Sequence, residues 1–170
     1  AALTLIGPMR LLSAAFSNVL RPRLAVQIKR GDIARFNRNL LISYACIAGI
    51  AMIGMIGAFL VGEYVFTMLF GAPFSAATAL LIPTIAYASL DTASTIQAVA
   101  IQVKFDSGAL FTAKLRIVCG LLSLLMLIPA CLYWGALGAI FALLLVELLY
   151  ILSTTWKLHR SPQPASPTAT

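Results

Sequence analysis

The chain has 170 residues, of which 61% are apolar and only 10% are charged, and its formal net charge is +7. An ordinary soluble domain is about 45–50% apolar and about 25% charged, so this composition excludes a soluble domain, a disordered chain and a secreted disulfide scaffold. The net positive charge alone would suit a nucleic-acid-binding domain. The basic residues, however, lie in segments between the apolar runs, where such residues set the orientation of a membrane protein. We therefore expect an integral membrane protein that binds no nucleic acid.

Long charge-free runs predict an all-α bundle of about five membrane-spanning helices. A bilayer core about 30 Å thick requires about 20 helical residues. These runs, together with a more polar first candidate, place the helices at about 2–20, 40–62, 76–101, 116–133 and 136–155. The bundle makes up one domain over 1–156, and the Pro/Ser/Thr-rich residues 157–170 are expected to form a disordered cytoplasmic tail.

The first predicted helix, 2–20, has an arginine near its middle. Arg10, Ser13 and Ser17 follow one another at helical spacing and therefore share one face. A charged residue at the centre of a membrane helix costs about 2.5–3.5 kcal/mol on an insertion-based scale. We therefore expect this face to line a bundle interior or a water-filled cavity.

The next segment, 21–39, is basic and amphipathic. It holds six Arg and Lys residues against a single acid, Asp32. We expect a connector that lies on the anionic inner surface of the membrane. Gly31 is expected to break it, and Asp32 to be the N-cap of a second short helix.

Small residues in the second predicted helix, 40–62, indicate close helix packing. Gly54, Ala58 and Gly62 repeat at four-residue spacing, which lets another helix backbone approach closely in a membrane. Gly138 and Ala142 repeat the pattern in the last helix.

Two acids lie inside later predicted helices, both a few residues to the cytoplasmic side of the membrane centre. Asp91 in helix 76–101 is surrounded by hydroxyl side chains that include Thr92 and Thr95, and Glu147 interrupts the last helix. Intramembrane acids of this kind are typical of substrate or ion pathways. The alternative is a structural ion pair between Arg10 and one of the two acids.

The run from Arg116 to Trp156 is long enough for two spans, with a hairpin predicted at Tyr133-Trp134-Gly135. Basic residues concentrate in the connectors 21–39 and 102–116 and in the tail, whereas the connectors 63–75 and 134–135 hold no basic residue. The positive-inside rule therefore predicts a multi-pass membrane protein with a cytoplasmic C-terminus.

The chemistry-bearing residues give no sign of an enzyme. Cys46, Cys119 and Cys131 all fall in predicted spans without a C-x-x-C spacing, and the single histidine, His159, lies in the tail. We expect no metal, no cofactor and no catalytic centre. A transport function is therefore the expectation.

Three segments resemble the C-terminal half of polysaccharide (O-antigen type) flippases of the multidrug/oligosaccharidyl-lipid/polysaccharide exporter superfamily. They are "NVLRPRLAVQIKRGDIARFNRNL" (18–40), "MLFGAPFSAA" (68–77) and "GALGAIFALLLVELL" (135–149), and the residues that carry the first two are Pro22, Gly31, Asp32, Phe70 and Gly71. The resemblance implies the last five helices of a twelve-helix transporter with a central cavity.

The resemblance further implies movement of a polyprenyl-diphosphate-linked oligosaccharide to the outer leaflet for surface polysaccharide synthesis. Local chemistry then suits Arg10, Ser13 and Ser17 to the diphosphate, and Asp91 and Glu147 to a coupled proton or cation. The chain begins at Ala1 without an initiator Met and without a signal peptide. We therefore expect an upstream lobe of the same protein as a partner.

Three other functions fit parts of the sequence. A multidrug/cation antiporter of the same superfamily would favour acidic cavities over Arg10. A membrane-embedded polysaccharide polymerase or ligase would need a larger outer loop than the predicted connectors provide. A structural or assembly protein of the membrane would need no cavity.

Overall fold

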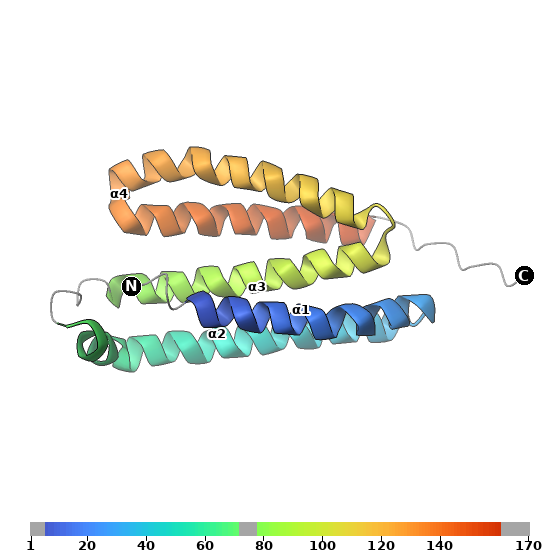
Figure 1. Ribbon diagram of the computed structural model, residues 1–170, viewed down its shortest axis with the longest axis horizontal. Coiled ribbons are helices and arrows are strands. Elements are labelled where there is room, and N and C mark those ends of the chain that lie inside the picture. Colours follow the sequence, from blue (N-terminus) through green and yellow to red (C-terminus); the bar gives the residue numbers. More distant parts are fainter. Residues whose placement is uncertain (1–5, 72–77, 161–170) are drawn as a thin grey trace, which may run out of the picture.

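The computed structural model describes residues 6–71 and 78–160, and the regular elements in these ranges are all helices. Figure 1 shows them side by side as one elongated bundle. They are α1 (Ile6–Lys29), α2 (Ile33–Phe70), α3 (Leu81–Lys104) and α4 (Gly108–Arg160). The all-helical fold class expected from the sequence is therefore confirmed.

Helix α4 is a hairpin with two arms, which we call the first arm (108–134) and the second arm (136–160). Gly135 has a non-helical backbone with φ 58° and ψ −140°, and the chain reverses there (Figure 1). A positive φ is accessible to glycine at little cost. The arms touch closely, because a Cβ atom on Gly138 would lie 2.1 Å from the carbonyl oxygen of Ala130.

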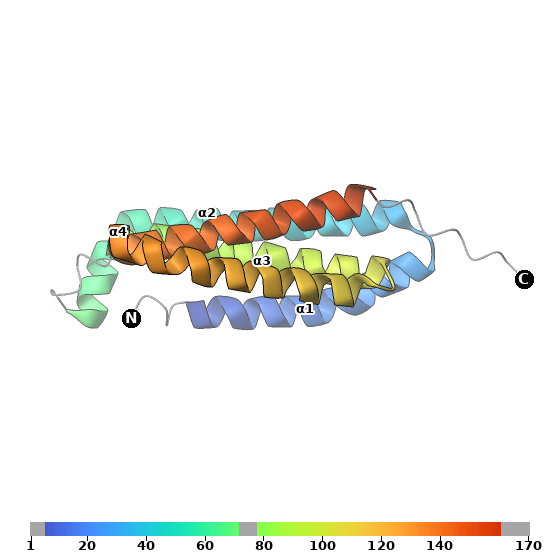
Figure 2. The same cartoon turned by 90° about the horizontal axis from the view of Figure 1, so that it is seen from above.

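Helix α3 occupies the centre and packs against α1, α2 and α4, as Figures 1 and 2 both show. α1, α3 and the second arm of α4 run in the same direction, whereas α2 and the first arm run oppositely. A buried apolar cluster that includes Leu24, Phe36 and Ile96 joins α1, α2 and α3.

Small residues bring α2 close to α3. A Cβ atom on Gly54 would lie 3.5 Å from the side chain of Ile85, and one on Gly62 would lie 3.1 Å from the side chain of Leu81. Gly62 therefore packs tightly against α3, whereas the contact at Gly54 is an ordinary one.

The structure differs from the sequence-based prediction at the basic segment 21–39. α1 continues through it to Lys29 and α2 begins at Ile33, so the connection is only residues 30–32. Gly31 adopts φ +70° in this turn, and Asp32 accepts a hydrogen bond from the Arg35 backbone N–H at 3.1 Å. Asp32 is therefore an N-cap as expected, but it caps the long helix α2 instead of a short surface helix.

The predicted outer connector 63–75 is also shorter than expected, because α2 extends to Phe70. At the other end α4 reaches Arg160, so the helix includes the first residues assigned to the tail. Residues 1–5, 72–77 and 161–170 lie outside the described part of the chain, and the predicted disorder of the tail falls there.

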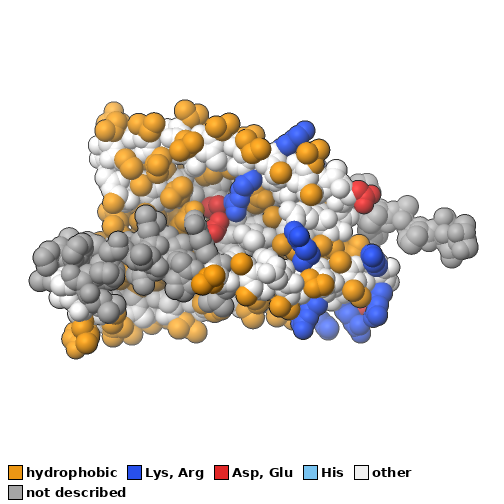
Figure 3. Space-filling view, viewed as in Figure 1, with side chains coloured by type: hydrophobic (Ala, Val, Ile, Leu, Met, Phe, Trp, Pro, Cys, Tyr) orange, Lys and Arg blue, Asp and Glu red, His pale blue; other side chains and the backbone are white. Residues whose placement is uncertain are grey.

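Three stretches among the described residues are long and apolar enough to cross a membrane: Ile33–Val65, Thr78–Lys104 and Gly108–Arg160. Large apolar side chains on the outer faces of α2 and α4 are exposed, as in Phe59, Leu125 and Leu132, which suits contact with lipid. Lys and Arg side chains gather toward one end of the bundle (Figure 3). These features are those of a helical membrane protein.

Candidate functional site

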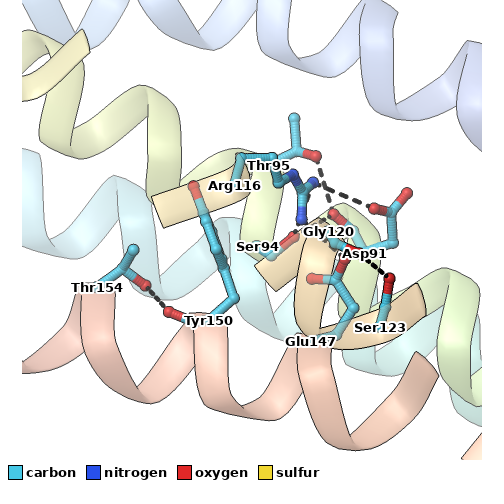
Figure 4. A network of polar contacts seen from close by, with 9 residues as sticks. All are labelled: Asp91, Ser94, Thr95, Arg116, Gly120, Ser123, Glu147, Tyr150 and Thr154. Atoms are coloured by element: carbon cyan, nitrogen blue, oxygen red, sulfur yellow. Dashed lines mark hydrogen bonds and ion pairs between the residues drawn. The ribbon is translucent and has the colours of Figure 1, made fainter. Parts of the chain in front are cut away.

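Three charged side chains meet between α3 and α4, and we call them the charge triad: Asp91, Arg116 and Glu147. Arg116 lies about two turns inside the first arm of α4. Its Nη1 donates to Glu147 Oε1 on the second arm at 2.8 Å, and its Nη2 donates to Asp91 Oδ1 on α3 at 3.3 Å (Figure 4). Three helical segments thus contribute one charge each to a single site.

Neighbouring side chains fix the position of the guanidinium group. Its carbon lies 4.7 Å from the centre of the Tyr150 ring, a cation–π distance, and Tyr150 is only 2% exposed. Tyr150 follows Glu147 by one helical turn, so the two share a face of the second arm. On the α3 side, the buried Ser94 hydroxyl accepts from Arg116 Nη2 at 3.5 Å.

The triad is unequally exposed, and with all three groups ionised its net charge is −1. The side chain of Arg116 is 43% exposed, that of Asp91 22% and that of Glu147 11%. Oε2 of Glu147 is buried and has no hydrogen-bond partner among the described residues. A buried carboxylate oxygen without a donor is energetically unfavourable, so this site suits a proton, a cation or water.

A cavity of about 330 Å³ adjoins the triad. Its volume lies at the lower end of the range for small-ligand sites. In Figure 3, acidic and basic side chains meet in a recess away from the ends of the bundle. The lining residues come from α3 and both arms of α4: Tyr87, Asp91, Arg116, Cys119, Gly120, Ser123, Leu143, Val146 and Glu147.

The polar residues predicted around Asp91 and in the first helix do not all join this site. Thr92 and Thr95 donate to backbone carbonyls of their own helix, at 2.8 Å and 2.9 Å, and are not among the residues that line the cavity. Ser13 is buried in the bundle, and Ser17 donates to the Ser13 carbonyl at 2.8 Å. The structure therefore brings together Asp91 and Glu147 but not the hydroxyl residues named with them.

The backbone of Arg10 lies in α1, and its side chain is outside the described part of the structure. The Arg21 side chain hydrogen-bonds to Gln102 on α3, and α1 and α3 run in the same direction (Figure 1). Arg10 precedes Arg21 by as many residues as Asp91 precedes Gln102. The backbones of Arg10 and Asp91 therefore lie at about the same depth in the bundle.

The role of Arg116 was not expected from the sequence, in which this residue lies at the edge of the predicted cytoplasmic connector 102–116. The connector is much shorter, because the turn between α3 and α4 is tight at Gly108, where a Cβ atom would lie 2.2 Å from the Ile101 carbonyl oxygen. α4 therefore begins early enough to carry Arg116 into the bundle. The available signal in the sequence was Asp106-Ser107 directly before Gly108, because Asp and Ser favour the N-terminus of a helix.

The residues that carry the family resemblance lie away from the cavity. Pro22 is inside α1, Gly31 and Asp32 form the turn before α2, and Gly71 caps the end of α2 with its N–H bonded to the Thr67 carbonyl. The side chain of Phe70 is outside the described part of the chain.

Within the described ranges, no group of three or more His, Cys, Asp or Glu side chains is placed to hold a metal ion. Cys119 is buried at the cavity, whereas Cys46 and Cys131 are exposed. The sequence matches no protein-family model, and no curated protein or solved structure was found to be similar to it.

Proposed function

We propose that the chain belongs to a membrane transporter in which the charge triad and its cavity line the route of a substrate or a coupled ion. The observation that carries this proposal is an Arg116 side chain that is 43% exposed beside two acids on the side of an otherwise apolar helix bundle. Charged groups at this depth are costly in contact with lipid. This surface therefore faces water or protein.

The proposed substrate is a polyprenyl-diphosphate-linked oligosaccharide, moved from the inner to the outer leaflet for surface polysaccharide synthesis. Its support is the order and spacing of the three sequence segments 18–40, 68–77 and 135–149. The net negative charge of the triad suits it to a coupled proton or cation and not to the diphosphate. Arg10, with Ser13 and Ser17, is the group proposed for the diphosphate.

The proposed topology is five spans in the inner membrane with the C-terminus in the cytoplasm. The concentration of Lys and Arg side chains at one end of the bundle supports a cytoplasmic location for that end. The reversal of α4 at Gly135 supports two spans within that helix. In a transporter of this architecture, an upstream lobe would form the opposite wall of the cavity.

A second candidate function is a multidrug/cation antiporter. One observation favours it: the described cavity carries two acids against one arginine, and Oε2 of Glu147 lacks a partner among the described residues. Such a site would attract an organic cation more readily than an anionic headgroup.

Two glycines provide a matched test of whether the cavity holds water. A Cβ atom added to Gly120 at the cavity, or to Gly57 on α2, would meet no atom within 4 Å, so both positions tolerate a cysteine that carries a spin label. Gly57 lies among exposed apolar residues such as Ile56 and Leu60. We expect the label at Gly120→Cys to be more accessible to a water-soluble nickel complex, and that at Gly57→Cys to oxygen dissolved in lipid.

The full-length protein in liposomes is the sample for this measurement by electron paramagnetic resonance. A label at Gly120→Cys that prefers oxygen would place the triad against lipid, and a label shielded from both reagents would place it against protein. Either result contradicts the proposal that the cavity is part of a transport route.

A further inference from the structure

We infer that Glu147 and Tyr150 hold Arg116 as a fixed part of the α4 hairpin, and that Asp91 is the exchangeable carboxylate of the triad. Exchangeable here means that Asp91 can release Arg116 and take a proton or cation while the rest of the triad stays in place. The role given to Asp91 rests on the proposed transport function. The roles given to Glu147 and Tyr150 do not.

The contact between Arg116 and Glu147 is the shorter and more buried of the two ion pairs. It measures 2.8 Å against 3.3 Å for the contact with Asp91, and the Glu147 side chain is half as exposed as that of Asp91, at 11% against 22%. Both partners belong to α4, so this ion pair ties the first arm to the second. A charge-assisted hydrogen bond of this length is among the strong ones.

The ring of Tyr150 makes a second contact with the guanidinium group of Arg116. The ring centre lies 4.7 Å from the guanidinium carbon. Tyr150 is itself only 2% exposed. One turn further along the second arm, the buried Thr154 hydroxyl donates to Gln97 Oε1 on α3 at 2.9 Å, which ties this part of the arm to α3. If the ring were absent, Arg116 would be free to leave Glu147 for water. Tyr150 is therefore a positioning residue.

The charge balance separates Asp91 from the other two members of the triad. Arg116 and Glu147 form a neutral pair, so Asp91 carries the surplus negative charge. Its carboxylate is held to Arg116 by the longer of the two ion pairs, at 3.3 Å. When Asp91 takes a proton or a cation, Arg116 keeps its bond to Oε1 of Glu147.

The first experiment compares the thermal stability of single variants of the full-length protein in detergent. We expect Asp91→Asn to unfold at the wild-type temperature, and Glu147→Gln and Tyr150→Leu to unfold at lower temperatures. Tyr150→Phe keeps the ring and is expected to match the wild type. Glu63→Gln and Tyr133→Leu, at exposed positions, are the matched controls.

The second experiment uses Cys119, which lines the cavity, as a reporter of local charge. In a protein with Cys46→Ala and Cys131→Ala, its rates of reaction with a cationic and an anionic methanethiosulfonate are compared. Asp91→Asn is expected to lower the ratio of the cationic to the anionic rate. Tyr150→Leu is expected to raise it because Arg116 moves away, and Tyr150→Phe to leave it unchanged.

The outcomes separate this inference from the proposed function. If Asp91→Asn destabilises the protein as much as Glu147→Gln, or if neither does, the division of roles is wrong. If Tyr150→Leu changes both reaction rates equally, Tyr150 is structural and not a positioning residue. Failure of Glu147→Gln to accumulate while Asp91→Asn accumulates supports the inference. The proposed function fails independently, through the labels at Gly120 and Gly57.

Discussion

At the scale of single residues, the central feature is an arginine that forms ion pairs with two acids from different helices. Arg116 reaches Glu147 within its own hairpin and Asp91 on α3. One positive charge cannot neutralise two negative charges, so the site retains a net negative charge inside an apolar bundle. In a low-dielectric environment this charge attracts protons and cations more strongly than it would in water.

The second arginine of interest is Arg10, whose backbone lies at about the depth of Asp91. Under the proposed flippase function, we expect Arg10→Ala to abolish surface polysaccharide display in a bacterium whose display depends on this protein, while the protein still accumulates in the membrane. Arg10→Lys should retain part of the activity, because a point charge remains although the bidentate geometry is lost. The measurement is polysaccharide display scored beside the amount of membrane-inserted protein.

Two alternative results would assign Arg10 differently. If Arg10→Ala lowers protein abundance and a second change, Asp91→Asn, restores abundance and display together, Arg10 is a structural partner of the acid. If Arg10→Ala leaves display unchanged but export of organic cations depends on Asp91, the antiporter function is supported instead.

At the scale of elements, the α4 hairpin decides where the triad lies. Arg116 and Glu147 are 31 residues apart in the chain, and only the reversal at Gly135 brings them together. The hairpin closes because Gly138 has no side chain: a Cβ atom there would lie 2.1 Å from the Ala130 carbonyl oxygen. This clash is with backbone and cannot be relieved by rotating a side chain.

We expect Gly138→Val to separate the two arms and to destabilise the protein by about 1–3 kcal/mol, the usual cost of overpacking. The control is Gly49→Val on α2, where a Cβ atom meets nothing within 4 Å. Unfolding in mixed detergent micelles measures both variants. Equal stability of Gly138→Val and Gly49→Val would show that close contact between the arms is not needed.

At the scale of the whole molecule, α3 is the element on which the others assemble. α1, α2 and α4 all pack on it. Its polar side chains contact both arms of α4, through Asp91 and Gln97, and also α1, through Gln102. Its apolar residue Ile96 belongs to the buried cluster shared with α1 and α2. Because α1, α3 and the second arm run in one direction, the turns at 30–32 and 105–107 and the end of α4 lie at the same end of the bundle (Figures 1 and 2).

This arrangement predicts the topology of the last two spans. In a protein whose own cysteines are replaced, cysteines at Ser107 and at Trp134 should be labelled from opposite sides of the membrane, Trp134 from outside. Trp134 is 74% exposed at the tip of the hairpin, so access is not limited by packing. Labelling of both positions from the same side would mean that the hairpin does not cross the membrane.

The sequence by itself determined the features that depend on local composition. Charge-free runs identified the apolar helices, Tyr133-Trp134-Gly135 marked the reversal of α4, and Asp91 and Glu147 were singled out because charged residues are costly within such runs. The sequence also indicated the N-cap at Asp32. Each of these signals comes from residues close together in the chain.

Only the tertiary structure decided which charge meets the two acids and how far the helices extend. The sequence suggested Arg10 as an alternative partner of the acids, and the partner observed in the described part of the chain is Arg116. The segment 21–39 continues two helices instead of forming a separate connector. Hydropathy cannot detect an arginine that enters the bundle from a helix end. Its partners are set by the packing of α3 between α1 and α4, which joins residues far apart in the sequence.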